Sequence, residues 1–123
     1  TSPYKLYQFF LNTTDQDVIN YIKYFTDFDK SEIESLNQET INNPKSRIAQ
    51  KKLSEDLVRT IHGNDGLSDA LRITEYFFKE KYQELSISDI EDIMEAFPSS
   101  QVSKQLLSSP SFIFKFLSNN FFQ

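Results

Sequence analysis

The stretch IHGNDG, residues 61–66, contains the only histidine of the chain and both of its glycines. Gly63 follows an apolar segment with helical periodicity, at a position where a helix C-terminus often needs a residue with positive φ. His62 falls in the last turn before it, where a partial positive charge is favoured. Asn64 or Asp65 can then cap the next helix. We interpret the stretch as the joint between two helices and not as a catalytic site, because no nucleophile or orienting carboxylate can be assigned to the histidine.

The segments on both sides of this joint repeat their apolar residues every three or four positions, which is typical of amphipathic helices. The upstream helix is predicted to start at the cap-plus-proline pair Asn43-Pro44, and the downstream helix is predicted to reach Phe78. The residues predicted to point inward are Ala49, Leu53, Leu57, Val58 and Ile61 in the first helix, and Leu67, Ala70, Leu71, Thr74, Phe77 and Phe78 in the second.

Cap residues mark further helix starts along the rest of the chain. These helices are predicted at residues 3–11, from Thr14 onward, at 30–41 behind the cap Asp29, at 87–97 behind Ser86, and from Ser109-Pro110 onward. The apolar faces predicted for the first two are Leu6, Phe9 and Phe10, and Val18, Ile19, Ile22 and Phe25. No segment alternates like a strand, so the predicted fold is all-α, a compact bundle of about five to seven helices. The polar stretch 98–109 is predicted to be a loop.

The composition fits one domain with a single core and excludes several classes of protein. Of 123 residues, 38% are hydrophobic and 15% aromatic, which argues against disorder. With no cysteine and one histidine, zinc and copper sites are not expected and no metal ligand is assigned. No apolar run approaches the ~20 residues of a membrane span, and the opening TSPYKLYQFF shows no targeting pattern.

The net charge of −5 is unfavourable for binding nucleic acid by charge alone. Basic side chains nevertheless gather in residues 45–59, namely Lys45, Arg47, Lys51, Lys52 and Arg59. A solvated helix face is the simpler explanation of this segment. The chain contains no GxSxG, no HExxH and no glycine-rich phosphate loop, and adjacent acidic pairs such as Glu55-Asp56 point about 100° apart on a helix. The residues by themselves therefore predict no catalytic site.

Two long segments resemble the bacterial and mitochondrial type of tyrosyl-tRNA synthetase. Residues 1–26, TSPYKLYQFFLNTTDQDVINYIKYFT, are similar to the segment that follows the catalytic signature loop in that family. Residues 49–78, AQKKLSEDLVRTIHGNDGLSDALRITEYFF, are similar to a later segment that carries HGxxGL. Residues 85–99, LSISDIEDIMEAFPS, resemble the acidic helix that follows, and residues 110–122, PSFIFKFLSNNFF, resemble the opening of the family's C-terminal domain.

The resemblance implies a domain organisation and an activity for the parent enzyme. Residues 1–97 would form the α-helical anticodon-binding domain, and residues 98–123 the linker and first helix of a truncated S4-like C-terminal domain. The parent would be a class I tyrosine–tRNA ligase that uses ATP, with Mg, to activate tyrosine and attach it to tRNA(Tyr). The family's ATP-binding motifs lie upstream, so the chain alone is expected to lack the catalytic centre and any cofactor. Family members dimerise through the catalytic domain, which implies a homodimeric parent and a monomeric fragment.

The resemblance also implies site residues. The family uses an aspartate at the start of the second helix to recognise guanine, the first anticodon base, and Asp15 occupies that position. A carboxylate accepts two hydrogen bonds from the N1–H and N2–H groups of guanine, a donor pair that no other base presents. The alternative for Asp15 is an electrostatic role at a helix N-terminus. Asn12 and Thr13, in the same loop, are predicted to contact ribose or phosphate. The candidates for contacts to the RNA backbone are Lys51, Lys52 and Arg59.

A different class of function stays open beside this one. The acidic surface and five phenylalanines near the end of the chain would also suit a helical protein–protein interaction module with no RNA role. These phenylalanines are Phe112, Phe114, Phe116, Phe121 and Phe122. The richness in Phe, Asn, Ser and Lys suggests an AT-rich genome, which favours the mitochondrial matrix, with the bacterial cytoplasm as the alternative. Neither a membrane nor DNA is an expected partner.

Overall fold

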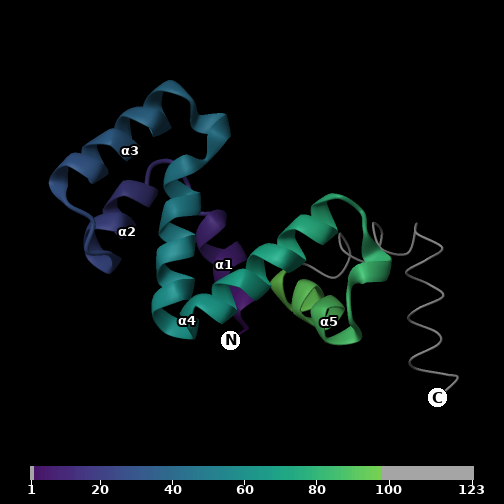
Figure 1. Ribbon diagram of the computed structural model, residues 1–123. Coiled ribbons are helices and arrows are strands. Elements are labelled where there is room, and N and C mark those ends of the chain that lie inside the picture. Colours follow the sequence, from purple (N-terminus) through teal and green to yellow (C-terminus); the bar gives the residue numbers. More distant parts are fainter. Residues whose placement is uncertain (1, 98–123) are drawn as a thin grey trace, which may run out of the picture.

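The computed structural model describes residues 2–97, and the fold within this range is all-α, as predicted. The helices are α1 (Pro3–Leu11), α2 (Val18–Phe25), α3 (Lys30–Asn42), α4 (Ile48–Phe78) and α5 (Ile87–Ala96), with two short 3-10 helices, η1 (Pro44–Ser46) and η2 (Tyr82–Glu84). Helices α1, α2 and α3 pack on α4, and α5 packs on α1 (Figure 1). No helix in the described range is both long and apolar enough to cross a membrane. The loop and helix predicted in residues 98–123 lie outside that range.

Helix α4 bends at Gly63, whose φ of +78° and ψ of 177° interrupt the helix. Figure 1 shows its two parts, residues 48–62 (the first half) and residues 64–78 (the second half), running in different directions. Gly66 lies within one turn of the bend, and a Cβ atom added to it would meet the Cβ of His62 at 2.5 Å. Glycine therefore has a steric reason to stand at that position. The prediction that residues 61–66 join two helices is confirmed.

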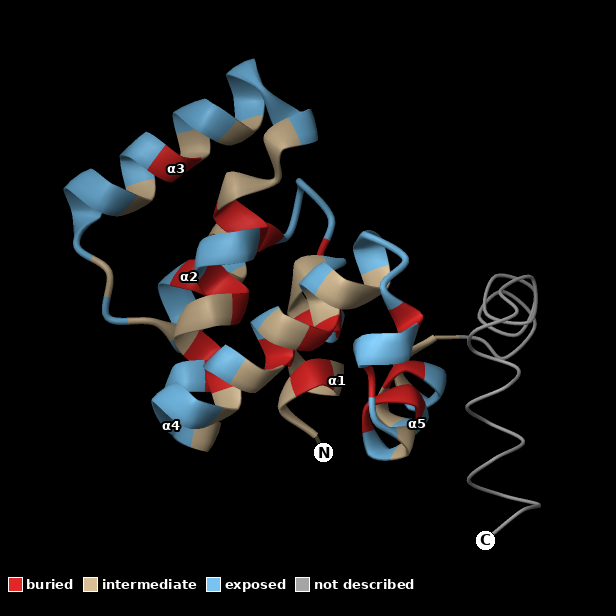
Figure 2. Cartoon of the chain, turned by 45° about the vertical axis from the view of Figure 1, so that its right-hand side comes forward, coloured by how far each residue is buried: buried red, intermediate tan, exposed pale blue. Residues whose placement is uncertain are grey.

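The buried side chains form two clusters instead of the single core that was predicted. Figure 2 marks the buried residues in red along the helices. The α5 core consists of Tyr4, Tyr7, Val58, Leu67, Ala70, Ile73, Tyr82, Leu85, Ile90 and Ile93. The α3 core consists of Val18, Ile22, Leu36, Ala49, Leu53 and Leu57. The bend explains the division, because it directs the apolar stripes of the two halves of α4 toward different neighbours. Three of the four buried apolar residues of the first half belong to the α3 core, and all three of the second half belong to the α5 core.

The predicted apolar face of α1 is confirmed for Leu6 and Phe10, which pack against the α5 core and the α3 core respectively, and is wrong for Phe9. The helix buries Tyr4, Tyr7 and Gln8 against α4 and leaves Phe9 69% exposed. Phe9 lies two residues from Tyr7 and therefore about 200° around the helix from it. The sequence offers apolar residues on both sides of α1, and the side that carries the two tyrosines is the one that meets α4.

Four other residues that were predicted to point inward are exposed, namely Phe25, Ile61, Leu71 and Phe78. Phe25 and Phe78 are the last residues of α2 and α4, and Ile61 lies two residues before the bend. A periodic pattern continues to the end of a helix whether or not a neighbour covers its last turn. The pattern therefore overestimates burial at these three positions. The structure gives no comparable reason for Leu71, which is 37% exposed.

Three predicted helix caps are confirmed. The side chain of Ser2 accepts a hydrogen bond from the Lys5 N–H at 3.1 Å, and that of Asp29 accepts from the Glu32 N–H at 2.8 Å. Ser86 and Asp89 exchange side chain to backbone hydrogen bonds in a capping box at the start of α5. Each cap satisfies backbone donors that have no partner inside the helix.

The carboxylate of Asp89 also connects α5 to the second half of α4. Its two oxygens accept hydrogen bonds from Arg72 at 2.9 and 3.0 Å, and Arg72 donates a third to Asp69 at 2.7 Å. Burial acts to raise the pKa of Asp89, but the hydrogen bonds from Arg72 and Ser86 outweigh it and hold that pKa below its ordinary value. One carboxylate thus caps a helix and anchors it.

Candidate nucleic-acid interface

The loop between α1 and α2 is a hydrogen-bonded turn. The Thr14 carbonyl accepts from the N–H groups of Asp17 at 3.1 Å and Val18 at 3.0 Å. The Thr14 hydroxyl donates to Asp17 Oδ2 at 3.0 Å and accepts from the Asp17 N–H at 3.3 Å. The prediction that Thr14 caps α2 is therefore wrong, because its cap-like contacts close a turn and α2 begins only at Val18. This turn presents Asp15 ahead of the helix and outside its first turn.

Asn12 and Thr13 connect this loop to α1. The Asn12 side-chain amide donates to the Gln8 carbonyl at 2.9 Å, and the Thr13 hydroxyl donates to the Phe10 carbonyl at 2.7 Å. Asn12 is exposed, whereas Thr13 is only 7% exposed. The buried Thr13 side chain supports the loop from within, whereas the exposed Asn12 side chain remains accessible to solvent.

Asp15 lies on the outer side of the loop with its side chain 44% exposed. Its Oδ1 atom accepts a hydrogen bond from Gln50 Nε2 at 2.8 Å and lies 3.9 Å from Arg47 Nη1. The carboxylate is thus accessible and is fixed from one side. Such a group can still accept hydrogen bonds from a ligand, since each carboxylate oxygen has two lone pairs.

Residues at the start of α4 hold the loop from the inside. Arg47 Nη2 donates to the carbonyls of Leu11 at 2.9 Å and Thr13 at 2.7 Å, and Gln50 Nε2 donates to the Thr13 carbonyl at 3.2 Å. Arg47 has left-handed backbone angles, with φ 53° and ψ 33°, directly after η1. The prediction that Asn43-Pro44 starts α4 is wrong, because this pair starts η1 and α4 begins at Ile48, after Arg47.

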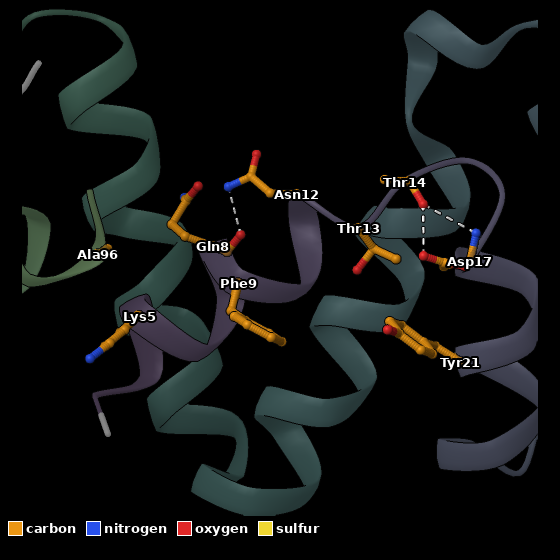
Figure 3. Close-up of a pocket in the computed structure, with 9 residues that line it drawn as sticks. All are labelled: Lys5, Gln8, Phe9, Asn12, Thr13, Thr14, Asp17, Tyr21 and Ala96. Atoms are coloured by element: carbon orange, nitrogen blue, oxygen red, sulfur yellow. Dashed lines mark hydrogen bonds between the residues drawn. The ribbon is translucent and has the colours of Figure 1, made fainter. Parts of the chain in front are cut away.

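An open pocket of about 410 Å³ lies beside the loop, between α1 and α2. Its lining consists of Lys5, Gln8, Phe9, Asn12, Thr13, Thr14, Asp17, Tyr21 and Ala96 (Figure 3). Figure 3 shows Phe9 projecting from α1 and Tyr21 from α2. Asp15 does not line the pocket, but Asp17 does. Phe9 was predicted to be part of an apolar face and Asp17 was not among the predicted site residues, so the aromatic and acidic character of this pocket was not predicted.

Lys51, Lys52 and Arg59 are all exposed on the first half of α4, and none of them lines the pocket. Their exposure agrees with a solvated helix face, and it leaves them accessible to an extended ligand. Among the described residues, no group of three His, Cys, Asp or Glu side chains is arranged to hold a metal ion.

Comparison with known proteins gives one consistent answer. Residues 1–79 match the family model described as class I tRNA synthetases (W and Y). The chain is similar to tyrosine–tRNA ligases from Staphylococcus carnosus (46% identity over 113 residues, 92% of the chain), Geobacillus stearothermophilus (46% over 99 residues, 80%) and Lactobacillus johnsonii (41% over 105 residues, 85%). It spans 27%, 24% and 25% of these relatives, respectively, which is about a quarter of their length.

These three relatives are bacterial proteins. The mitochondrial location expected from composition finds no support among them, and the bacterial alternative agrees with them. An AT-rich genome biases amino-acid usage in bacteria as well as in mitochondria, so composition does not distinguish the two locations.

Proposed function

The chain belongs to the family of class I tRNA synthetases for tryptophan and tyrosine, and from this premise we propose that it is the anticodon-recognition domain of a tyrosine–tRNA ligase. The parent protein would use ATP with Mg to activate tyrosine and would transfer it to tRNA(Tyr). In this proposal the parent is a homodimer in the bacterial cytoplasm, and the chain alone is monomeric. Catalysis belongs to parts of the parent outside this chain.

The observation that carries the proposal is the fixed, accessible carboxylate of Asp15, in a loop whose Thr13, Thr14 and Asp17 line an open pocket with an exposed aromatic ring. Proteins that read single-stranded RNA splay out a base, stack it on an aromatic side chain and hydrogen-bond its Watson–Crick edge. Phe9, 69% exposed on the pocket wall, supplies a stacking surface. Asp15 supplies two acceptor oxygens for the N1–H and N2–H groups of guanine.

The surrounding charge suits short-range recognition better than long-range attraction. The net charge of −5 disfavours nonspecific binding to phosphates. The exposed Lys51 and Lys52 on α4 provide local positive charge, whereas Lys5 at the pocket is paired with Glu95 at 3.2 Å. The alternative function, a helical protein–protein module, rested largely on phenylalanines that lie outside the described residues, and we keep it as an outcome of the test.

The first test is a titration of the ¹⁵N-labelled 123-residue chain with an anticodon stem-loop RNA carrying GUA, compared with the same stem-loop carrying AUA. We expect amide shifts centred on residues 12–18 that weaken with the AUA variant. Shifts of equal size for both RNAs, spread over residues 45–59, would contradict recognition of guanine. No shifts with either RNA would favour the protein–protein module.

The second test assigns the carboxylate in the intact ligase. We expect Asp15→Ala to raise the KM for tRNA by about tenfold or more, because a lost bidentate base contact weakens binding by ~1–3 kcal/mol. The rate of tyrosine activation should stay unchanged. Asp17→Ala tests the rival carboxylate on the pocket wall, and Asp27→Ala, which removes the same charge from the exposed loop before α3, is the matched control. Equal loss in both steps of the reaction would contradict the assignment.

A further inference from the structure

We propose that Arg47 and Gln50 are positioning residues that set the orientation of the Asp15 carboxylate and thereby determine the preference for guanine. The inference rests on the proposed function, since it concerns the same base contact. It assigns a role to two residues at the start of α4, which lie 32 and 35 positions after Asp15 in the sequence.

The amide of Gln50 is committed to the loop. Gln50 is 1% exposed, and its Nε2 atom donates to the Thr13 carbonyl at 3.2 Å and to Asp15 Oδ1 at 2.8 Å. A primary amide has two N–H groups, so both of its donors are engaged. Both partners are acceptors, which also fixes the orientation of the amide, because its oxygen could not stand in that place. A neutral donor orients the Asp15 carboxylate without neutralising its charge.

Arg47 completes the same arrangement. Its Nη2 atom donates to the carbonyls of Leu11 and Thr13, and its Nη1 atom lies 3.9 Å from Asp15 Oδ1. The Thr13 carbonyl thus accepts from both side chains and uses both of its lone pairs. Arg47 adopts this position with a φ of 53°, in the left-handed region where glycine is favoured and other residues are strained. The guanidinium is the feature that glycine could not supply.

These contacts affect recognition because the side chains of Arg47 and Gln50 both approach the Asp15 carboxylate, the group proposed to bind guanine. A free aspartate side chain samples several staggered rotamers, and binding a base would have to select one of them. A carboxylate that is already held loses less conformational freedom on binding. Removing Gln50 or Arg47 should therefore reduce the preference for guanine while Asp15 is still present.

The test measures the dissociation constants of the GUA and AUA stem-loops for variants of the 123-residue chain. The quantity compared is the dissociation constant for AUA divided by that for GUA, which is high when guanine is preferred. We expect Gln50→Leu to lower the ratio by about fivefold or more, the scale of one lost hydrogen bond to a charged group. The dissociation constant for AUA should change less than twofold. Ser54→Ala is the matched control, since Ser54 is fully buried one turn further along α4 and its hydroxyl has no partner within the described range.

A double-mutant cycle separates positioning from a structural role. In the Asp15→Ala background, Gln50→Leu should produce no further change in the ratio, because the carboxylate it acts through is gone. Arg47→Gly adds an independent check. It relieves the left-handed strain, so the fold should be retained, whereas the ratio should fall.

Each failure has a distinct meaning. If Asp15→Ala leaves the ratio unchanged, the proposed function is overturned and this inference with it. If Asp15→Ala lowers the ratio but Gln50→Leu and Arg47→Gly do not, the proposed function stands and only the positioning role is overturned. Additive effects of Gln50→Leu and Asp15→Ala would likewise overturn the positioning role.

Discussion

The two halves of α4 hold their neighbours by different means. The second half buries Leu67, Ala70 and Ile73 in the α5 core, together with the rings of Tyr4 and Tyr7 from α1. The first half also has a buried stripe, but Arg47, directly before it, and Gln50, near its start, contact the loop between α1 and α2 through hydrogen bonds. Apolar packing tolerates small shifts, whereas hydrogen bonds require particular atoms at particular distances. From this comparison we propose that the second half mainly supports stability and that the start of the first half supports recognition.

The arginines Arg47 and Arg72 show the same difference. Arg72 binds a capping carboxylate whose side chain is 10% exposed, and so connects two helices. Arg47 binds backbone carbonyls at the end of α1 and in the loop, next to an accessible carboxylate. The same side chain serves in one place to join elements and in the other to shape a surface.

A matched pair of core substitutions tests this division most strongly. Ile73→Ala and Leu53→Ala each remove a side chain with 0% exposure, and each should lower the free energy of unfolding by about 2–5 kcal/mol in urea titrations. Their effects on RNA binding should differ. Leu53 follows Gln50 by one turn, so Leu53→Ala should also reduce the ratio of AUA to GUA dissociation constants, whereas Ile73→Ala should not. An equal loss of the ratio in both variants would contradict the division.

Arg72→Ala should have the next largest effect. It leaves the buried Asp89 without its bidentate partner. We expect the free energy of unfolding to fall by about 1–3 kcal/mol at pH 7, a loss that is limited because Arg72 is itself 37% exposed. The guanine preference should be unchanged.

The pH dependence of this effect follows from the lowered pKa of Asp89. Stabilisation by a carboxylate with a lowered pKa is complete above the pKa of the unfolded state and is lost as the pH falls through the folded value. The stabilities of the wild type and Arg72→Ala should therefore converge on acidification below about pH 4. Arg59→Ala, at an exposed position, serves as the control. A constant difference between pH 7 and pH 3 would argue against this ion pair as the cause.

Gly63→Ala tests the bend that separates the two halves. No atom lies within 4 Å of the added Cβ, so the cost is that of backbone angles (φ 78°, ψ 177°) that residues other than glycine rarely adopt, about 1–3 kcal/mol. The melting temperature should fall by ~4–8 °C for each kcal/mol, as estimated for a domain of this size. Ser68→Ala, at an exposed helical position beyond the bend, should leave it nearly unchanged. An unaltered melting temperature in Gly63→Ala would indicate that the bend does not depend on glycine.

Asp92→Asn should have the smallest effect, in the opposite direction. Burial raises the pKa of Asp92, and the charges of Asp89 and Glu95 raise it further. An acid with a raised pKa destabilises the fold when it is ionised. The substitution should therefore stabilise the protein at pH 7 by about 0.3 kcal/mol, after allowance for solvent screening. The gain should vanish below about pH 4, where both states are protonated. Glu91→Gln, at the exposed neighbouring position, is the control. A comparable gain in stability from Glu91→Gln would indicate that the lower net negative charge, and not the environment of Asp92, is the cause.

The local parts of the fold were predictable from the sequence. The caps Ser2, Asp29 and Ser86 and the joint at Gly63 depend on chemistry within a few residues, and all four are confirmed. The starts of α2 and α4 were predicted too early, because Thr14 closes a turn and Asn43-Pro44 opens a 3-10 helix. A cap-like residue shows that the chain changes direction, but the tertiary contacts decide where the helix begins.

The candidate site was predictable only through resemblance to a family. Asp15 is one exposed aspartate among many, and its residue type and spacing do not distinguish it from Asp17. The contacts of Arg47 and Gln50 with the loop leave no local signal, since neither residue is near Asp15 in sequence. The exposure of Phe9 was likewise hidden, because both sides of α1 carry apolar residues and the neighbour that covers one of them lies elsewhere in the chain.

The hydrogen bonds that hold the loop between α1 and α2 join residues 34 to 37 positions apart, and the chain between them contains all of α2 and α3. Closing so long a segment costs chain entropy before any of these contacts forms. The loop therefore reaches its final geometry late in folding, after α2 and α3 have docked. Helix α3 buries a single residue, Leu36, so its docking is among the weaker steps. A peptide that ends before Arg47 would contain Asn12, Thr13 and Asp15 but not the arrangement in which the protein presents them.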